Sequence, residues 1–502
     1  MHNRGIGAWP ARRARSTPDA VALVHRGERT TYAVLHDRVT RLAHGLRERG
    51  VEAGARVAYL GPNHPAFVET MFATHVLGGV FVPLNWRLAA PELDYTLDDV
   101  GASVLVIAPE NAAVASSLAW AGTRIARDPH DGRAVSYEEV LAPSGSPPID
   151  VPVAPSDPAL VLYTSGTTGR PKGAVLTHDN LHWNTLNLLI DVDVAGDEVT
   201  LVSAPLFHVA ALDQTFLPTF LKGGTSVIMP SWDVEACFDL VEQERVTWMF
   251  GVSAMFAGLT RSPRWETADL SSLRTLMSGG APVPEALIRA YQDRGLVFCQ
   301  GYGMTETAPG ATFLRPEQSV SRLGTAGTPC FFVDVRVASP DLEDVGIGVP
   351  GEVLVRGPNV SPGYWGRPDA TAAAFTEDGW LRTGDVATVD ADGYLTIVDR
   401  VKDMYISGGE NVYPAEVEAA MFEHPGVAEA AVIGVPDERW GEVGAAYVVA
   451  RPGASLDPDD LRAFLRTRLA SYKVPVHVHE VEDLPRTGSG KVRKHALRDL
   501  DA

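Results

Sequence analysis

The sequence predicts an α/β protein with a large multi-layered N-terminal α/β domain, a β-rich subdomain and a small α+β C-terminal domain. Three observations lead to this expectation. The chain has 502 residues, far more than one compact core usually holds. Strand-like and helix-like runs alternate in its first part. After residue 320 the pattern changes to short strand-like runs separated by Gly and Pro turns.

In the first part, the expected elements follow from the spacing of apolar residues. From Tyr32 to Leu46 these recur at steps of three and four, which predicts an amphipathic helix that closes near Gly50. The other expected elements of this part are strands at 57–60, 104–107, 159–163 and 226–229 and a helix at 67–77. Strands that alternate with helices predict mainly parallel sheets.

The later part is expected to be richer in strands and to end in a separate small domain. The expected elements are strands at 333–337, 352–355, 430–435 and 445–449 and helices at 414–422 and 459–469. The segment beyond residue 400 is long enough for an α+β domain of its own. We therefore expect an N-terminal domain at 1–399, a C-terminal domain at 400–502 and a hinge at 399–403.

Composition narrows the classes of function. The 45% hydrophobic and 21% charged residues are typical of a globular protein, and the net charge of −20 argues against nucleic acid as a partner. The three cysteines, Cys237, Cys299 and Cys330, show no metal or disulfide spacing, which favours the reducing cytoplasm. No apolar run is long enough to span a membrane. We expect residues 1–20 to form a surface segment that leads into the first helix.

The densest motif is a segment rich in glycine and hydroxyl residues, directly after the expected strand at 159–163. It reads LYTSGTTGRPKG over residues 162–173. Its backbone N–H groups and hydroxyls can surround phosphate oxygens, and Lys172 adds positive charge. It is not a Walker A loop, because Pro171 and Gly173 flank the lysine. A polar connector without function is the alternative interpretation.

Two other short motifs do not support a function. Residues 346–351 match GxGxxG, but no strand precedes them and no helix is expected after them, so a dinucleotide site is rejected. Asn359 begins an Asn-Val-Ser glycosylation pattern without any secretory context.

Five motifs together resemble the adenylate-forming superfamily of acyl-CoA synthetases, amino-acid adenylation domains and firefly-type luciferases. They are LYTSGTTGRPKG at 162–173, GYGMTET at 301–307, TGD at 383–385, DRVKDMYISGGENVYPAEVE at 399–418 and PRTGSGKVRK at 485–494. The likeness is greatest to bacterial fatty-acyl or aryl-acid CoA ligases. It implies that ATP and Mg²⁺ activate a carboxylic acid as acyl-AMP, and that coenzyme A then takes the acyl group.

The resemblance assigns a phosphate site. Thr305 would contact the α-phosphate, Glu306 would hold Mg²⁺, and Lys491 would be the mobile catalytic lysine between carboxylate and phosphate. In isolation, Thr305 and Glu306 could cap a helix and Lys491 could be a surface lysine. The residues that match the loop over the β and γ phosphates are Thr164, Ser165, Gly166, Thr167, Thr168, Gly169 and Lys172.

The resemblance also assigns the nucleoside and coenzyme A sites. Asp385 would accept the ribose hydroxyls, although an Asp after Gly is more often a turn residue. The residues matched to the nucleotide are Gly280, Ala281, Pro282, Tyr302, Asp385 and Arg400. Those matched to coenzyme A are Gly408, Gly409, Trp440, Arg87 and Lys473. Val474 stands where some relatives have a second cation, which weakens the phosphate end of this site.

The acyl pocket is expected to be apolar and roomy, with His208 at its mouth. The residues matched to it are His208, Val209, Ala210, Phe250, Ser253, Gly303 and Met304. Ordinary core packing is the alternative for each of them. No Asp stands where adenylation domains bind a substrate ammonium, so we expect a hydrophobic monocarboxylic acid rather than an amino acid.

Three alternatives to the full reaction stay open. The chain could catalyse one half-reaction only, since Tyr405 replaces an aliphatic residue near the hinge. It could load a free carrier protein instead of coenzyme A, or be a binding protein on an enzyme scaffold. The resemblance further implies that the C-terminal domain rotates about Lys402 between the two steps. The sequence does not identify the acid, and a homodimer stays open.

Overall fold

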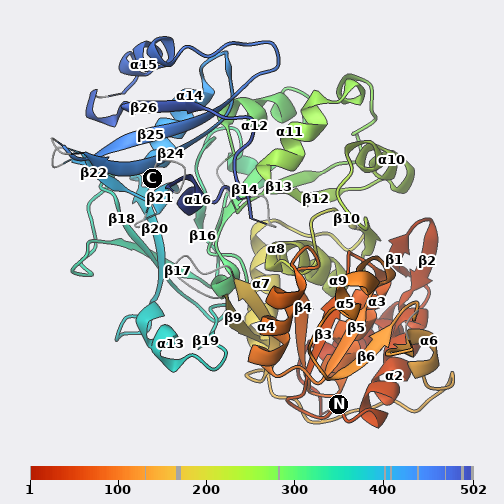
Figure 1. Ribbon diagram of the computed structural model, residues 1–502. Helices are drawn as coiled ribbons and strands as arrows, with labels where there is room; N and C mark the ends of the chain where they lie inside the picture. Colours follow the sequence, from red (N-terminus) through yellow and green to blue (C-terminus); the bar gives the residue numbers. More distant parts are fainter. Residues whose placement is uncertain are drawn as a thin grey trace.

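A computed structural model describes residues 2–129, 132–164, 171–280, 283–400, 403–407, 410–437, 440–469, 471–487 and 491–498, without the side chains of residues 400, 406, 410, 411 and 498. Figure 1 shows a large body built from the first part of the chain and a smaller unit, in blue, formed by its end. The body contains two large sheets, and each of the strands β1–β16 and β19 belongs to one of them. A smaller sheet lies beside the blue unit. The predicted α/β class is therefore confirmed.

One large sheet has nine strands in the order β16-β15-β14-β13-β12-β10-β11-β1-β2. Its central strands are parallel, and antiparallel strands stand at both edges. The strands are β1 (Val21–His25), β2 (Glu28–Thr31), β10 (Val199–Val202), β11 (Thr225–Ile228), β12 (Trp248–Gly251), β13 (Thr275–Ser278), β14 (Phe298–Tyr302), β15 (Thr312–Phe313) and β16 (Thr328–Pro329).

The other large sheet has eight strands in the order β19-β9-β8-β4-β3-β5-β6-β7. The strands from β8 to β7 pair parallel, and β9 pairs antiparallel with both β8 and β19. The strands are β3 (Arg56–Leu60), β4 (Val80–Leu84), β5 (Val104–Ile107), β6 (Thr123–Ala126), β7 (Val135–Ser136), β8 (Pro158–Thr164), β9 (Lys172–Thr177) and β19 (Gly363–Tyr364). The glycine-rich segment therefore connects two antiparallel strands, β8 and β9.

The predicted β-rich region is a four-stranded antiparallel sheet in the order β17-β18-β20-β21. Its strands are β17 (Asp334–Ala338), β18 (Gly351–Arg356), β20 (Leu381–Val389) and β21 (Leu395–Arg400). Gly351, the last residue of the GxGxxG match, begins a strand and not a helix, which agrees with the rejection of a dinucleotide site.

The last unit combines a sheet with helices, and two of the helices correspond to those expected at 414–422 and 459–469, whereas the helix at 494–498 was not expected. Its strands are β22 (Tyr405–Ser407), β23 (Glu410–Val412), β24 (Val427–Asp437), β25 (Gly441–Ala450) and β26 (His477–Glu480), and its helices are α14 (Pro414–Phe422), α15 (Pro458–Arg466) and α16 (Lys494–Arg498). Tyr405 is buried in its core, and a Cβ on Gly434 would lie 2.3 Å from the Cβ of this tyrosine. Two glycines, Gly434 and Gly444, therefore make room for the Tyr405 ring.

The helices of the larger body cover the two large sheets (Figure 1). They are α1 (Trp9–Ser16), α2 (Tyr32–Glu48), α3 (Pro65–Val76), α4 (Ala90–Val100), α5 (Ala112–Ser116), α6 (Tyr137–Val140), α7 (His178–Asp191), α8 (Val209–Ala211), α9 (Leu217–Lys222), α10 (Val234–Glu244), α11 (Ser253–Arg261), α12 (Glu285–Gln292) and α13 (Pro368–Ala374). Helix α2 shows why the periodicity is informative. Thr31 caps it by accepting from Val34 N, and its apolar stripe is fully buried.

The chain start departs from the expectation of a surface segment. Ile6 and Trp9 are 0% and 3% exposed and belong to the same core as α2 and α3. Apolar burial outweighs the Arg-rich character of the neighbouring residues, whose side chains stay at the surface. No helix of the described residues has the length and apolar character of a membrane span.

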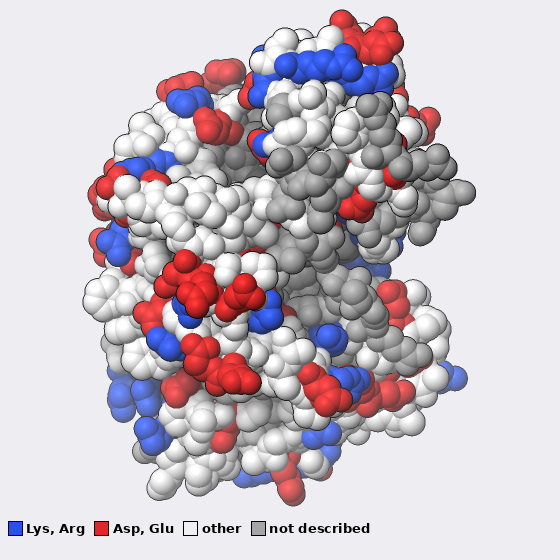
Figure 2. All heavy atoms as spheres, turned by 90° about the vertical axis from the view of Figure 1, so that its left-hand side faces the viewer, with Lys and Arg blue, Asp and Glu red and all other residues white. Residues whose placement is uncertain are grey.

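Two further features bear on surface chemistry. All three cysteines are buried and unpaired, and burial raises the pKa of the Cys237 thiol to about 12. Asn359 is also buried, so its glycosylation pattern is not accessible in the fold. Figure 2 shows acidic and basic side chains interspersed on one face of the molecule.

Candidate active site

Tyr302 and Asp385 are brought together from different sheets. Tyr302 ends β14, Asp385 lies in β20, and the tyrosine hydroxyl donates to Asp385 Oδ2 at 2.8 Å. The Thr383 hydroxyl accepts from Asp385 N at 3.1 Å and donates to Val353 O at 2.8 Å, which ties the turn before Asp385 to β18. An aromatic ring next to a carboxylate acceptor has the chemistry that a nucleoside requires.

A second pair lies at Glu306. This carboxylate is in the short helix η5 (Thr305–Thr307), is 5% exposed, and accepts a hydrogen bond from the Tyr364 hydroxyl at 2.7 Å. Lys172 Nζ lies over the Tyr364 ring, 5.5 Å from its centroid. Burial, and then the Glu306 charge, raise the pKa of Tyr364, so its hydroxyl stays protonated and donates. The Tyr364 side chain thus connects Glu306 with Lys172 of the glycine-rich segment.

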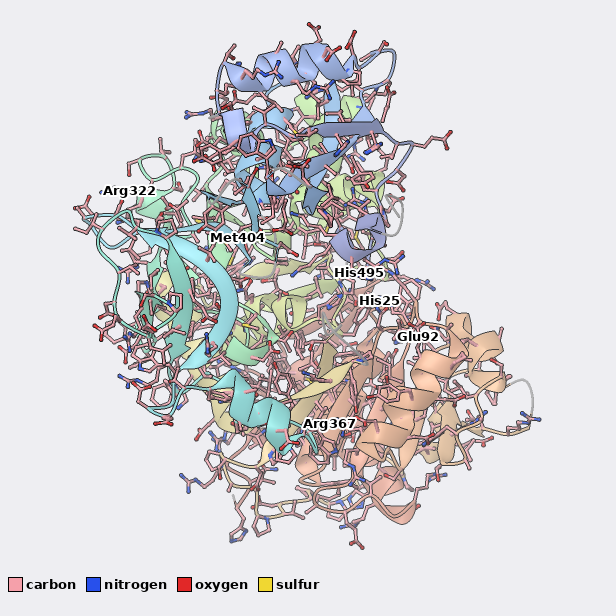
Figure 3. The ribbon with its side chains drawn as sticks, turned by 60° about the vertical axis from the view of Figure 1, so that its left-hand side comes forward. His25, Glu92, Arg322, Arg367, Met404 and His495 are labelled. Carbon is pink, nitrogen blue, oxygen red and sulfur yellow. The ribbon has the colours of Figure 1, made fainter. Side chains whose placement is uncertain are left out.

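The base of the glycine-rich segment is fixed by residues of α4. The Tyr163 hydroxyl donates to Asp99 Oδ2 at 2.8 Å, and Arg367 pairs with the other Asp99 oxygen. Tyr95 donates to Pro171 O at 3.1 Å at the far end of the segment. Figure 3 shows Arg367 beside α13, where this part of the chain meets the N-terminal elements. Both ends of the segment are thereby anchored to one helix.

Within the segment itself, Thr164 and Lys172 are register partners at the ends of β8 and β9, and the Thr164 hydroxyl donates to Lys172 O at 3.4 Å. Ser165, Gly166, Thr167, Thr168 and Gly169 lie outside the described residues. Gly280 is described, with a φ of +82°. Ala281, Pro282, Lys402, Gly408 and Gly409 lie outside, as does the Arg400 side chain.

His208 lies directly before α8 and brings the two parts of the chain into one site. Its Nε2 atom is shielded from solvent and has no partner among the described residues. Burial first, and then the charges of Lys491 and Arg87, lower the pKa of His208 to about 4. Lys491 of the last unit is therefore close enough for its charge to act on His208. The imidazole is neutral at physiological pH.

The segment that carries His208 is held by Asn63. The Asn63 amide Nδ2 donates to Ala204 O at 2.9 Å and to Met229 O at 3.1 Å, and its Oδ1 accepts from Leu206 N at 2.7 Å. Asn63 is only 4% exposed. Its side chain therefore fixes the backbone two residues before His208 from both sides.

The residues matched to the acyl pocket come from four parts of the chain. Val209 and Ala210 are in α8, Phe250 is in β12, and Ser253 begins α11. Gly303 and Met304 follow β14. A Cβ on Gly303 would lie 1.7 Å from Pro309 O. The backbone of the following turn therefore requires a glycine at this position whatever the pocket volume.

The residues matched to coenzyme A differ in their surroundings. Trp440 is 46% exposed. Lys473 forms an ion pair with Glu416 of α14 at 2.7 Å. Arg87 lies over the Trp86 ring, 5.0 Å from its centroid, and its charge acts on His208. Arg87 is thus brought to the His208 site, while Lys473 is paired within its own unit.

Three residues of the site were not identified from the sequence: Asn63, Asp99 and Tyr364. Their partners lie far away along the chain; Asn63, for example, contacts residues about 140 positions later. The residue types gave little signal, because an Asn before a helix or a Tyr in a short strand is common. A signal that could have indicated a strand end at Tyr364 is the Gly-Tyr pair directly before Trp365.

These contacts involve residues of four of the five motifs: Tyr302 and Glu306, Asp385, Lys172, and Lys491. A family model described as AMP-binding enzyme matches residues 10–365, and one described as AMP-binding enzyme C-terminal domain matches residues 416–491. The chain belongs to the AMP-binding enzyme family. This confirms the resemblance inferred from the five motifs.

Individual relatives cover almost the whole chain. Feruloyl-CoA synthase from an Amycolatopsis species is 56% identical over 498 residues, with 99% of each chain covered. Indoleacetate–CoA ligase from Aromatoleum aromaticum is 43% identical over 501 residues, with 99% and 98% covered. The structure of ATP-bound MatB from Rhodopseudomonas palustris matches with a TM-score of 0.90 and 33% identity, with 98% of each chain covered. The protein is accordingly an AMP-forming acyl-CoA synthetase.

Proposed function

We propose that this synthetase acts on an aryl acid with a short unsaturated side arm, a phenylpropenoic acid, and that it uses ATP, Mg²⁺ and coenzyme A. The observation that carries the proposal is His208, which burial keeps neutral, near the cations Lys491 and Arg87 and directly before the apolar Val209. Cations next to a neutral, apolar environment suit a carboxylate on an apolar body. The relative at 56% identity is named for a feruloyl product and the one at 43% for indoleacetate, both aryl acids.

For the nucleotide, we assign the adenine and ribose to the Tyr302–Asp385 pair, together with Gly280, Ala281, Pro282 and Arg400. The β and γ phosphates are assigned to residues 164–169 and Lys172. This assignment is supported by the anchoring of both ends of that segment to α4 through Tyr163 and Tyr95. A rigid base keeps the backbone donors in place, so little reorganisation is needed when phosphate binds.

Glu306 fits the role of a Mg²⁺ holder. Its carboxylate is buried and accepts a hydrogen bond from the Tyr364 hydroxyl, a neutral donor that does not form an ion pair with it. Mg²⁺ takes one or two protein carboxylates and fills its other positions with phosphate oxygens and water. When bound, the metal would offset the negative charge on the phosphate oxygens.

Lys491 and Thr305 serve the first chemical step in this proposal. The carboxylate oxygen of the acid attacks the α-phosphorus of ATP, the bond to the β-phosphate oxygen breaks, and pyrophosphate leaves. Both reacting groups are anions, so a lysine between them lowers their repulsion and stabilises the developing charge. His208 borders the carboxylate as a neutral group. No side chain becomes acylated.

For the second step we propose a rotation of the C-terminal domain (residues 400–502) about the hinge at 399–403. Lys491 must withdraw while Gly408, Gly409 and Trp440 approach, with Arg87 and Lys473 available to the coenzyme A phosphates. Lys402→Pro tests this, because proline fixes φ near −65°. Pyrophosphate release should persist while thioester formation from supplied acyl-AMP falls by orders of magnitude. Wild-type rates in both steps would contradict the hinge.

The substrate proposal is tested by pyrophosphate release with a panel of acids. Ferulate and related phenylpropenoic acids should give the highest kcat/KM, followed by arylacetic acids and then by long-chain fatty acids. A best substrate that is an amino acid or a short dicarboxylic acid would contradict the apolar pocket.

The acceptor and assembly are tested separately. Coenzyme A should outcompete an added carrier protein, and transfer to the carrier at an equal rate would reassign the acceptor. A homodimer is a further proposal, which sedimentation of the purified chain would decide. The three buried thiols agree with the proposed cytoplasmic location, where cysteines stay reduced.

A further inference from the structure

Tyr364 touches two residues of opposite charge at the phosphate end of the site. Its hydroxyl donates to Glu306 Oε1 at 2.7 Å, and its ring carries Lys172 Nζ at 5.5 Å from the centroid. Within the part of the chain that the structure describes, Lys172 and Glu306 form no ion pair with each other. One aromatic side chain therefore contacts both the cation and the anion.

The backbone around Tyr364 is held from several sides. Tyr364 is the register partner of Ala174 in β9, so Lys172, two residues earlier, is its diagonal neighbour on the same face of the sheet. Tyr364 N donates to the Thr371 hydroxyl at 3.0 Å, and Trp365 N donates to Gly173 O at 2.8 Å. Ser361 N also donates to Glu306 O at 2.8 Å. The tyrosine thus joins the Lys172 strand to the turn that carries Glu306.

The chemistry of a tyrosine at this place is specific. A carboxylate that is 5% exposed needs a hydrogen-bond donor, and an Arg or Lys donor would cancel its charge. A phenol donates without cancelling that charge. The ring face attracts the Lys172 ammonium by a cation–π interaction and leaves its N–H donors available to a ligand. Removal of the ring would let Lys172 and Glu306 pair and neutralise each other.

We propose that Tyr364 is a positioning residue that holds Glu306 ready for a divalent cation and Lys172 ready for phosphate while preventing the two from pairing. The cation and the phosphates are then bound as one unit. This inference rests on the proposed nucleotide site, and it adds a residue for which neither the motifs nor the relatives' names give a role.

The test measures metal binding directly. Mn²⁺ is titrated into the full-length protein with a non-hydrolysable ATP analogue, and free Mn²⁺ is followed by electron paramagnetic resonance. Tyr364→Phe keeps the ring and removes the hydroxyl, and should weaken Mn²⁺ binding about ten-fold, since one hydrogen bond to a charged group is lost. The KM for the acid should not change. Tyr364→Leu should weaken binding of the ATP analogue as well, because Lys172 is released to pair with Glu306.

Two further variants make the result specific. Tyr394→Phe is the matched control, because Arg322 likewise lies over the Tyr394 ring, 4.4 Å from its centroid, but Tyr394 is in the turn between β20 and β21 and not in the strand β19 of Tyr364. It should leave Mn²⁺ binding at the wild-type value. In Glu306→Gln, the added Tyr364→Phe change should cause no further loss, because the tyrosine acts through the glutamate.

The outcomes separate the two levels of the proposal. Unchanged Mn²⁺ affinity in Tyr364→Phe, or additive losses in the double variant, would overturn the positioning role while the proposed function stands. Failure of the wild-type protein to bind Mn²⁺ with the ATP analogue would instead contradict the proposed nucleotide site. Melting temperatures of all variants show whether each one is folded.

Discussion

The larger body and the C-terminal unit hold their candidate site residues in different ways. In the larger body, candidate residues are held in pairs: Tyr302 with Asp385 at 2.8 Å and Tyr364 with Glu306 at 2.7 Å. In the C-terminal unit, Lys491 and Trp440 are exposed. Fixed pairs suit a nucleotide that occupies one position in both steps. Exposed side chains suit residues that must enter the site for one step and leave it for the other. The larger body is therefore preorganised, whereas the C-terminal unit supplies different residues in the two steps.

Removal of the exchanging lysine should give the largest effect. Lys491→Ala should slow acyl-AMP formation by about 10²-fold or more, since its charge lies where two anions meet. Coenzyme A transfer from supplied acyl-AMP should be largely spared. Pyrophosphate release measures the first half-reaction and thioester formation the second. Lys494→Ala is not a suitable control, because Lys494 forms an ion pair with Glu418 at 2.8 Å and its loss would affect stability. Equal loss of both half-reactions would contradict the proposal that Lys491 serves only acyl-AMP formation.

The second-largest effect is expected on the stability of the larger body at acidic pH. Burial lowers the pKa of His75 to about 4 and that of His64 to about 3, and it lowers the pKa of His178 as well. Their folded pKa values lie below the unfolded value near 6.5, so the unfolded state takes up protons first as pH falls. The free energy of unfolding should fall by up to roughly 1.4 kcal/mol per histidine per pH unit between about pH 6.5 and about pH 4.

Urea unfolding at several pH values measures this loss, and His75→Gln should reduce its slope. A free energy of unfolding that does not change over that interval would show that these histidines are protonated in the folded protein.

A smaller effect is expected at the scaffold of the acyl pocket. Asn63→Ala leaves the carbonyls of Ala204 and Met229 without their donor, and should reduce the free energy of unfolding by about 2–3 kcal/mol. It should also raise the KM for the acid, because the segment before His208 loosens. Asn3→Ala is the control: Asn3 is 4% exposed and donates to His75 O at 3.0 Å, at the opposite end of α3 from Asn63. It should lower stability without changing that KM.

The smallest effect concerns Lys473. Its ion pair with Glu416 is partly exposed, so Lys473→Ala should lower stability by at most about 1 kcal/mol. If the lysine also meets a coenzyme A phosphate, Glu416→Gln should lower the KM for coenzyme A and Lys473→Ala should raise it. No change in either variant would remove Lys473 from the coenzyme A site.

The sequence predicted whole elements well where one local pattern determined them. The α2 stripe and the helix at 414–422 were found because apolar spacing and a Pro at the first helical turn are local signals. The prediction of a surface segment at the start of the chain was wrong, because the burial of Ile6 and Trp9 depends on a core formed with helices that are distant in the sequence. The hairpin of β8 and β9 also could not be read from spacing, since strand direction is a property of pairing.

For the site, motifs gave the residue types but not their partners. The Tyr302–Asp385 pair was assigned residue by residue, yet the hydrogen bond joining them was not foreseen. Gly303 was expected to enlarge the pocket, whereas the approach of Pro309 O gives it a backbone role. Asn63 and Tyr364 have no motif of their own, and only contacts over long sequence separations reveal them.

The burial of Cys237, Cys299 and Cys330 offers a way to watch the proposed rotation. Thiol-directed dyes react with exposed thiolates, and these thiols are buried, with raised pKa values. A pair of cysteines introduced at exposed positions outside the proposed site, Val476 in the C-terminal unit and Val34 on α2, would therefore be labelled selectively in the otherwise native chain. Energy transfer between the two dyes would report the distance between the units in single molecules as ATP, acid and coenzyme A are added.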